Sequence, residues 1–172
     1  MSNFETLFCD NDLVRRAHAL IATCAGLGLR IATAESCTGG LLAGLLTEVP
    51  GSSNVVDRGF VTYSNEAKQD MLGVDPELLA LYGAVSAPVA RAMAEGAIAH
   101  SRAELSVAVT GIAGPGGGSV DKPVGLVHFA RAERNGLVQV EERRFGDLGR
   151  ASVRRAALDV ALSLLEARAK GV

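Results

Sequence analysis

The stretch LRIATAESCTGGLLAGLL, residues 29–46, decides the fold class of this chain. Residues 29–33 are mostly apolar and predict a short strand, and the apolar run 41–46 predicts a helix over about 38–48. A carboxylate, two hydroxyls, a thiol and two glycines lie in the turn between them, at 35–40. A strand that leads through a polar turn into a helix is typical of open α/β sheets, in which ligands bind beyond the carboxyl ends of the strands.

The flanking segments alternate between helix and strand patterns. Residues 11–27 carry apolar side chains at helical spacing, with Gly26 and Gly28 at the expected end. A second strand is predicted at 58–64, followed by a helix at 66–72 that Asn65 would cap and Gly73 would end.

The second half of the chain completes this pattern. Asp75 begins a short helix, Ser86 caps a longer one, and a strand is expected at 105–110. Segments 124–132 and 137–145 flank Asn135-Gly136, which is a strong hairpin signal, and a closing helix is expected at 150–169. This order predicts one domain over residues 1–172, with a core of about 11–168. We expect an α/β sandwich with a mixed, mostly parallel sheet flanked by helices and a C-terminal hairpin plus helix.

Composition excludes several classes of protein. A chain of 172 residues with a formal charge of −2 is long enough to bury a core and has no basic footprint for nucleic acid. No uninterrupted apolar run approaches the roughly 18 residues of a membrane span. The three cysteines, Cys9, Cys24 and Cys37, form no CxxC pair, and the three histidines are scattered, so no metal site is expected. We expect a cytoplasmic protein without a cofactor.

Three polar or glycine-rich turns follow predicted strands, at 35–40, 63–68 and 110–118. The first is either a helix start capped by Thr38, or a set of free backbone N–H groups that attracts an anion, with Ser36 or Cys37 as a nucleophile. In the second, Lys68 is either a solvated helix lysine or a desolvated base, with Tyr63 as a proton donor. The third is either a flexible loop or a ligand-binding loop. We expect the three turns to meet in one pocket.

Several separated motifs carry a resemblance to a known family. The segments ATAESCTGGLLAGLLTEVPGSS, RGFVTYSNEAKQDMLGV and TGIAGPGGGSVDKPVGLVHFA, followed by the helix at 150–155, resemble the CinA C-terminal domain family. The resemblance covers about residues 11–168 and implies a nicotinamide-nucleotide amidohydrolase of the stand-alone form. Such an enzyme hydrolyses the carboxamide of nicotinamide mononucleotide to nicotinic acid mononucleotide and ammonia, without a metal, as a salvage step of the pyridine nucleotide cycle.

The resemblance also implies site residues. It points to Lys68 as the base, Tyr63 as its proton-relay partner, and either Ser53 or Ser36 as the nucleophile, with a slight preference for Ser53. Arg150, Arg154 and Arg155 are possible cations for the phosphate, and Arg154 is the one that we select. The expected substrate-binding residues lie in the first and third turns and the last helix: Glu35, Thr38, Gly39, Gly40, Thr110, Gly111, Ala113, Gly114 and Arg154.

Two other functions remain open on the sequence. One is a non-catalytic nucleotide-binding or regulatory module of the same fold, which would keep the glycine turns but would not need Lys68 or the serines. The other is an amidohydrolase that acts on a different small amide. In each case the expected partner is a small molecule rather than nucleic acid or a membrane, and the apolar helix faces predict a homodimer or higher homo-oligomer.

Overall fold

The computed structural model describes residues 11–134, 136, 138–169 and 171. A five-stranded sheet with the order β2-β1-β3-β4-β5 forms its centre. Strands β1 (Ile31–Glu35), β2 (Val56–Val61) and β3 (Leu105–Gly111) run parallel, whereas β4 (Leu126–Glu133) is antiparallel to both β3 and β5 (Val138–Arg144). The predicted mixed sheet and the terminal hairpin are confirmed, although Cys9, Asn135 and Leu137 lie outside the described residues.

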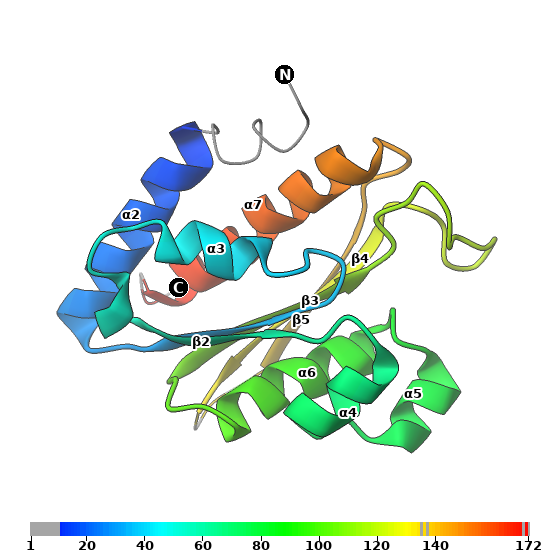
Figure 1. Cartoon of the computed structure of the whole chain (residues 1–172), viewed down its shortest axis with the longest axis horizontal. Helices are drawn as coiled ribbons and strands as arrows, with labels where there is room; N and C mark the ends of the chain where they lie inside the picture. Colours follow the sequence, from blue (N-terminus) through cyan, green and yellow to red (C-terminus); the bar gives the residue numbers. More distant parts are fainter. Residues whose placement is uncertain (1–10, 135, 137, 170, 172) are drawn as a thin grey trace.

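Helices cover both faces of the sheet (Figure 1). Helices α2 (Asn11–Leu27), α3 (Leu41–Thr47) and α7 (Arg150–Ala169) pack on one face, and α4 (Asn65–Leu72), α5 (Pro76–Tyr82) and α6 (Ala87–Ala99) lie on the other. Among the described residues, no helix combines the length and apolar character needed to cross a membrane.

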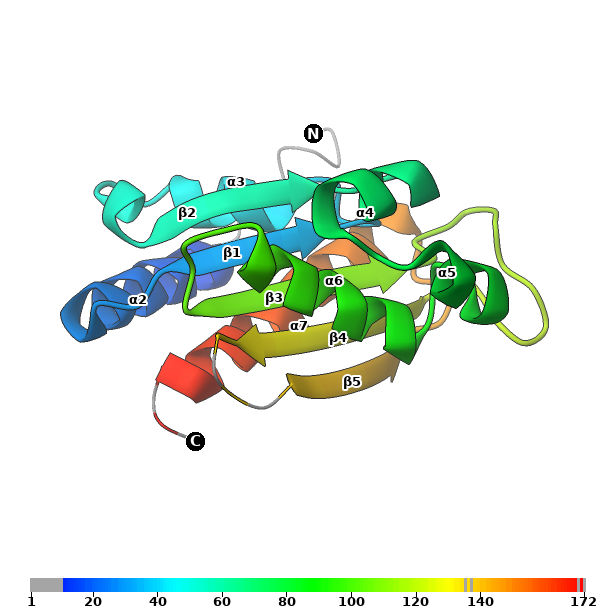
Figure 2. The same cartoon turned by 90° about the horizontal axis from the view of Figure 1, so that it is seen from below.

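The two faces of the sheet carry side chains of different size. Large side chains such as Ile31, Val107 and Phe129 pack against α2, α3 and α7, because alternate strand residues point to one face. The other face carries Ala32, Ala34, Ala108 and similar small residues against α6. Small residues permit close approach of the helix, which lies across the strands in Figure 2.

Gly96 of α6 is required for the same close packing. A Cβ at Gly96 would lie 2.1 Å from the backbone oxygen of Leu72 in α4, which no real contact allows. Helix α6 therefore holds α4 tightly, and α4 carries Lys68.

Helix boundaries were predicted well where a local cap defines them. The side chains of Asp75 and Ser86 accept hydrogen bonds from Glu77 N and Val89 N, as expected of N-caps. Helix α2 ends at Leu27, and Gly28 is the left-handed C-cap residue with φ 65°. Because Leu29 N donates to Cys24 O as part of this cap, β1 begins at Ile31 rather than at residue 29.

Three predicted caps or boundaries near the polar turns were wrong. The N-cap of α3 is Gly40, with φ 89°, and the helix begins at Leu41, so Thr38 caps nothing. Strand β2 covers 56–61 rather than 58–64. Ser64 rather than Asn65 caps α4, because the Ser64 side chain accepts from Ala67 N at 3.0 Å.

Candidate active site

The turn after β1 is held from both neighbouring strands. Ser36 N donates to Val109 O of β3 at 2.9 Å, and Thr62 N donates to Glu35 O at 2.8 Å. The chain then reverses, with Gly39 N donating to Ser36 O, and Gly39 and Gly40 adopt φ values of 61° and 89°. Glycine tolerates this left-handed backbone at little cost. Ser36 is therefore presented, half-buried, at the carboxyl edge of the parallel strands.

The carboxylate of Glu35 occupies the amino terminus of α3. Its two oxygens accept hydrogen bonds from Gly40 N at 3.1 Å, Leu42 N at 3.0 Å and Ala43 N at 2.8 Å, and Thr33 Oγ1 donates to Oε1 at 3.2 Å. Glu35 has no exposed surface. The expectation of free N–H groups for a substrate anion at this helix was therefore wrong, because a side chain of the protein already binds them.

Lys68 lies on the buried face of α4, one turn before Leu72. Its side chain is 1% exposed, and Nζ lies 3.2 Å from Ser36 Oγ, 2.9 Å from Thr62 O and 3.4 Å from Ser64 O. The solvated alternative for this lysine is thus wrong. The fold therefore brings Lys68 and Ser36, two of the predicted catalytic residues, within hydrogen-bond distance.

Burial lowers the pKa of Lys68, since it removes water from the charged ammonium. The charges of Cys37 and of the exposed Glu66 act in the opposite direction, but burial has the larger effect on this pKa. An uncharged amine has two N–H groups and one lone pair. The carbonyls of Thr62 and Ser64 can accept the two N–H groups, which leaves the lone pair for the hydroxyl proton of Ser36.

Cys37 is next to Ser36 but is not activated as a nucleophile. The thiol is buried, and burial, together with the nearby charge of Glu35, raises its pKa to about 12. Because the thiolate is the reactive form, Cys37 is a poor nucleophile near neutral pH. Of the two candidates in this turn, Ser36 is the one with a base beside it.

A cavity of about 250 Å³ opens above Ser36 and Cys37. The loop after β3 and the residues Tyr63 and Arg150 complete its lining, so the three predicted turns do meet here. Arg150 Nη1 donates to Gly114 O at 3.1 Å and Nη2 donates to Tyr63 Oη at 3.0 Å. Tyr63 thus accepts from a cation and keeps its own hydroxyl proton for donation into the cavity.

The end of β3 and the loop that follows it form a glycine-rich wall of the cavity. Gly111, Ala113 and Gly114 all contribute to the lining, as do Gly116 and Gly117. A Cβ at Gly111 would lie 2.7 Å from Val127, and one at Gly114 would lie 2.8 Å from Val124, so both positions require glycine for packing. The glycines leave backbone atoms at this wall, beside the side chains of Ile112 and Ala113.

Six of the predicted binding residues do not line this cavity: Glu35, Thr38, Gly39, Gly40, Thr110 and Arg154. Thr110 Oγ1 donates to Ala84 O at 2.8 Å and ties β3 to the loop between α5 and α6. Arg154 Nη2 donates to Thr38 O at 2.8 Å and so braces the turn from α7. A Cβ at Gly39 would lie 3.4 Å from the same Arg154 nitrogen. Arg150, one helical turn earlier, is the arginine that reaches the cavity.

Ser53 lies away from Ser36 and Lys68. It is exposed in a short 3₁₀ helix, Ser52–Asn54, that precedes the amino end of β2. Ser36 and Lys68 lie at the opposite, carboxyl end of the parallel strands. The preference for Ser53 over Ser36 is therefore corrected, since the length of β2 separates Ser53 from Lys68.

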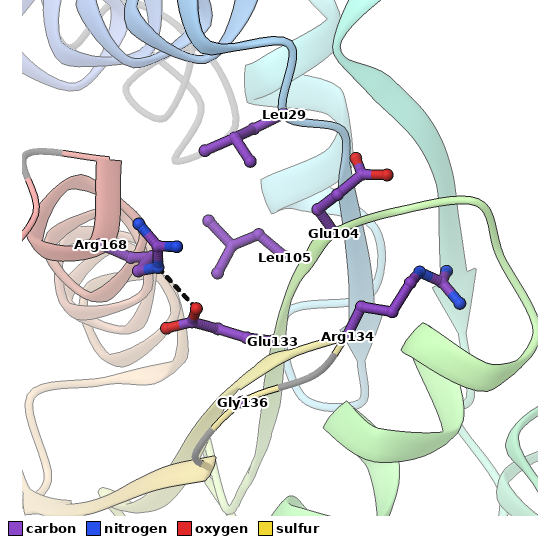
Figure 3. Close-up of a pocket in the computed structure, with 7 residues that line it drawn as sticks. All are labelled: Leu29, Glu104, Leu105, Glu133, Arg134, Gly136 and Arg168. Atoms are coloured by element: carbon purple, nitrogen blue, oxygen red, sulfur yellow. Dashed lines mark ion pairs between the residues drawn. The ribbon is translucent and has the colours of Figure 1, made fainter.

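Two larger cavities lie at the other end of the sheet: one of about 340 Å³ at the amino edge of β1 and β3, and one of about 410 Å³ between the end of α6 and the adjoining ends of β4 and β5. Figure 3 shows that, in the first of them, Glu133 pairs with Arg168 and Arg134 points away from this pair. Glu104, the other charged residue of this lining, accepts a hydrogen bond from Arg30 N at 2.7 Å. Arg134 donates to the carbonyls of Ile98, Ser101 and Ala103. Because these groups stabilise the fold, the smaller cavity at Ser36 is the candidate active site.

The described part of the chain contains no group of three or more potential metal-binding side chains. The chemistry available at the cavity is that of a hydroxyl, a desolvated amine, a phenol and a guanidinium. Such a set can support attack on a carbonyl carbon with acid–base assistance.

Comparison with known proteins agrees with this architecture. The family model described as "CinA C-terminal domain" matches residues 14–169. A crystal structure of the competence/damage inducible protein CihA from Agrobacterium tumefaciens is 58% identical, covers 91% of this chain and 95% of its own, and superposes with a TM-score of 0.90. A CinA superfamily protein from Escherichia coli is 36% identical over 92% of this chain and 91% of its own, with a TM-score of 0.85.

A curated relative, the CinA-like protein of Syntrophobacter fumaroxidans, is 54% identical over 80% of this chain but only 32% of its own length. The chain thus spans about a third of the curated relatives that it matches. The chain belongs to the CinA C-terminal domain family.

Proposed function

We propose that this protein hydrolyses the carboxamide of nicotinamide mononucleotide to nicotinic acid mononucleotide and ammonia. One observation carries the proposal: the buried Lys68 lies 3.2 Å from the hydroxyl of Ser36, and Ser36 lines a polar cavity. Serine–lysine pairs are a known arrangement for activating a serine nucleophile. The resemblance to nicotinamide-nucleotide amidohydrolases supplies the substrate.

The reaction would begin at Ser36. Lys68 accepts the proton of Ser36 as Oγ bonds to the carboxamide carbon, and a negatively charged tetrahedral intermediate forms. Tyr63 donates a hydrogen bond to the developing charge, and the loop after β3 lines the same cavity. The C–N bond then breaks, and the ammonium of Lys68 returns its proton to the departing ammonia.

Hydrolysis of the resulting ester would complete the cycle. Water attacks the ester carbon and passes a proton to Lys68. The bond between Ser36 Oγ and carbon breaks, and Lys68 returns the proton to Ser36 Oγ. The products are the nicotinate nucleotide and free enzyme, and the atoms balance with water as the only co-reactant.

Arg150 supports recognition of the ribose phosphate. It is anchored on Gly114 O and Tyr63 Oη, at the rim of the cavity, where its charge can attract a phosphate. This assignment replaces Arg154, whose guanidinium braces Thr38 O.

The test compares kcat/KM for nicotinamide mononucleotide, nicotinamide riboside and free nicotinamide, each measured with and without a chelator. We expect efficient ammonia release from the phosphorylated substrate alone, unchanged by chelation. Equal kcat/KM values for the three substrates would show that the protein does not recognise the phosphate. Binding of the nucleotide without ammonia release would instead favour a non-catalytic nucleotide-binding module.

A further inference from the structure

We propose that Glu35 is a positioning residue of this site: its carboxylate binds the amino terminus of α3 and so fixes the turn that presents Ser36, instead of contacting the substrate. The inference rests on the proposed function for its catalytic consequence. It stands on the four hydrogen bonds to Gly40, Leu42, Ala43 and Thr33 and on the complete burial of the side chain.

Glu35 is connected to the reacting groups through both its backbone and its side chain. Its carbonyl oxygen accepts from Thr62 N, and Thr62 O accepts from Lys68 Nζ. Its side chain fixes α3, while the next residue is Ser36. One residue therefore links the strand that carries the serine to the segment that holds the lysine.

The same contacts exclude a substrate anion from this helix. The carboxylate supplies the negative charge that the partial positive charge of a helix N-terminus attracts, and it saturates three N–H groups that point there. A phosphate must consequently bind elsewhere along the cavity, where the lining provides Arg150 and the loop after β3.

Glu35→Gln tests the proposal with the smallest change in shape. The amide keeps one oxygen but turns an NH₂ group toward backbone N–H donors, so the turn must shift. Since a misplacement of about 1 Å can cost about 100-fold in rate, we expect kcat to fall about 10- to 100-fold. KM for nicotinamide mononucleotide should change less than about threefold, because no substrate contact is lost.

The matched control is Asp75→Asn, which makes the same carboxylate-to-amide change at the N-cap of α5, away from Ser36. Because Asn caps a helix about as well as Asp, thermal stability should change little, and kcat should stay within about twofold. Thr33→Val, which removes the hydroxyl bond to Glu35 Oε1, provides a graded variant should Glu35→Gln not fold. Thr33→Val should lower kcat with KM unchanged, and equal kcat in both Thr33→Val and wild type would then count against the proposal.

A second readout is independent of deamidation. The charge of Glu35 helps to raise the pKa of Cys37, so Glu35→Gln should let the Cys37 thiolate, followed by its ultraviolet absorbance, form at lower pH, whereas Asp75→Asn should not. A folded Glu35→Gln variant with normal kcat and an unchanged thiol titration would overturn the proposal. So would a variant whose defect lies in KM alone. If wild type releases no ammonia, the proposed function fails; a folded Glu35→Gln variant as thermally stable as wild type would then separately overturn the role of Glu35 at α3.

Discussion

Replacement of Lys68 by methionine separates its catalytic role from its role in packing. Methionine has nearly the same length and is apolar, so it suits a position that is 1% exposed. Thr62 O loses its 2.9 Å partner, whereas Ser64 O keeps the hydrogen bond from Lys68 N. We therefore expect a folding cost of about 1–3 kcal/mol for one unpaired carbonyl, offset in part because a desolvated amine is removed.

The effect on rate should be much larger. A general base contributes about 10²–10⁴ in rate, so Lys68→Met should lower kcat by at least about 100-fold. Lys68→Arg should fail as well, because a guanidinium does not deprotonate in this pH range. Ammonia release under steady-state conditions measures kcat, and circular dichroism confirms that each variant is folded.

Lys122→Met is the matched control. Lys122 also donates to a backbone carbonyl, that of Tyr82 at 2.6 Å, but it lies on the loop after β3 rather than beside Ser36. Its replacement should leave kcat within about threefold of wild type. Near-normal kcat in folded Lys68→Met would refute the assignment of Lys68 as the base.

Three further outcomes follow from the same geometry. Because burial lowers the pKa of Lys68, kcat/KM should rise with pH and level off at a pH below 10.5, the ordinary lysine pKa. A rise that continues to pH 10.5 would show that Lys68 is solvated. The pKa of Cys37 is raised from 9.0 to about 12, so its contribution to stability is present below pH 9 and is lost as the pH rises above it. In chemical denaturation, wild type should lose about 1.4 kcal/mol of unfolding free energy relative to Cys37→Ala between neutral pH and about pH 10. Parallel plots of unfolding free energy against pH for the two proteins would contradict this. Arg150→Ala should raise KM for nicotinamide mononucleotide about tenfold or more while KM for nicotinamide riboside stays unchanged, and an equal change for both would indicate that Arg150 acts only through Tyr63.

Local signals explain which parts of the fold were predictable. Asp75 and Ser86 cap their helices with side chains two or three residues away from their partners, so the sequence near each cap contains the relevant information. The cap of α3 was missed because Glu35 reaches five to eight residues ahead across a tight turn. That contact depends on how β1 and α3 pack, which spacing alone does not reveal.

The candidate site was predictable in part for a similar reason. Lys68 and Tyr63 were found because they follow a strand end, where α/β sites gather. The choice between Ser36 and Ser53 depended on the direction of β2, whose parallel pairing with β1 puts Ser53 at the far edge. Arg150 and Arg154 lie one helical turn apart, and only the orientation of α7 decides that Arg150 reaches the cavity.

The pairing of Ser36 with Lys68 as the hydrolytic centre is tested most directly by ammonia release from nicotinamide mononucleotide, measured for wild type, Ser36→Ala and Ser53→Ala together. We expect wild type and Ser53→Ala to release ammonia at similar rates, and Ser36→Ala to lose at least about 100-fold in kcat, because the hydroxyl 3.2 Å from Lys68 Nζ is removed. Normal ammonia release by folded Ser36→Ala, or its loss in Ser53→Ala, would contradict the account.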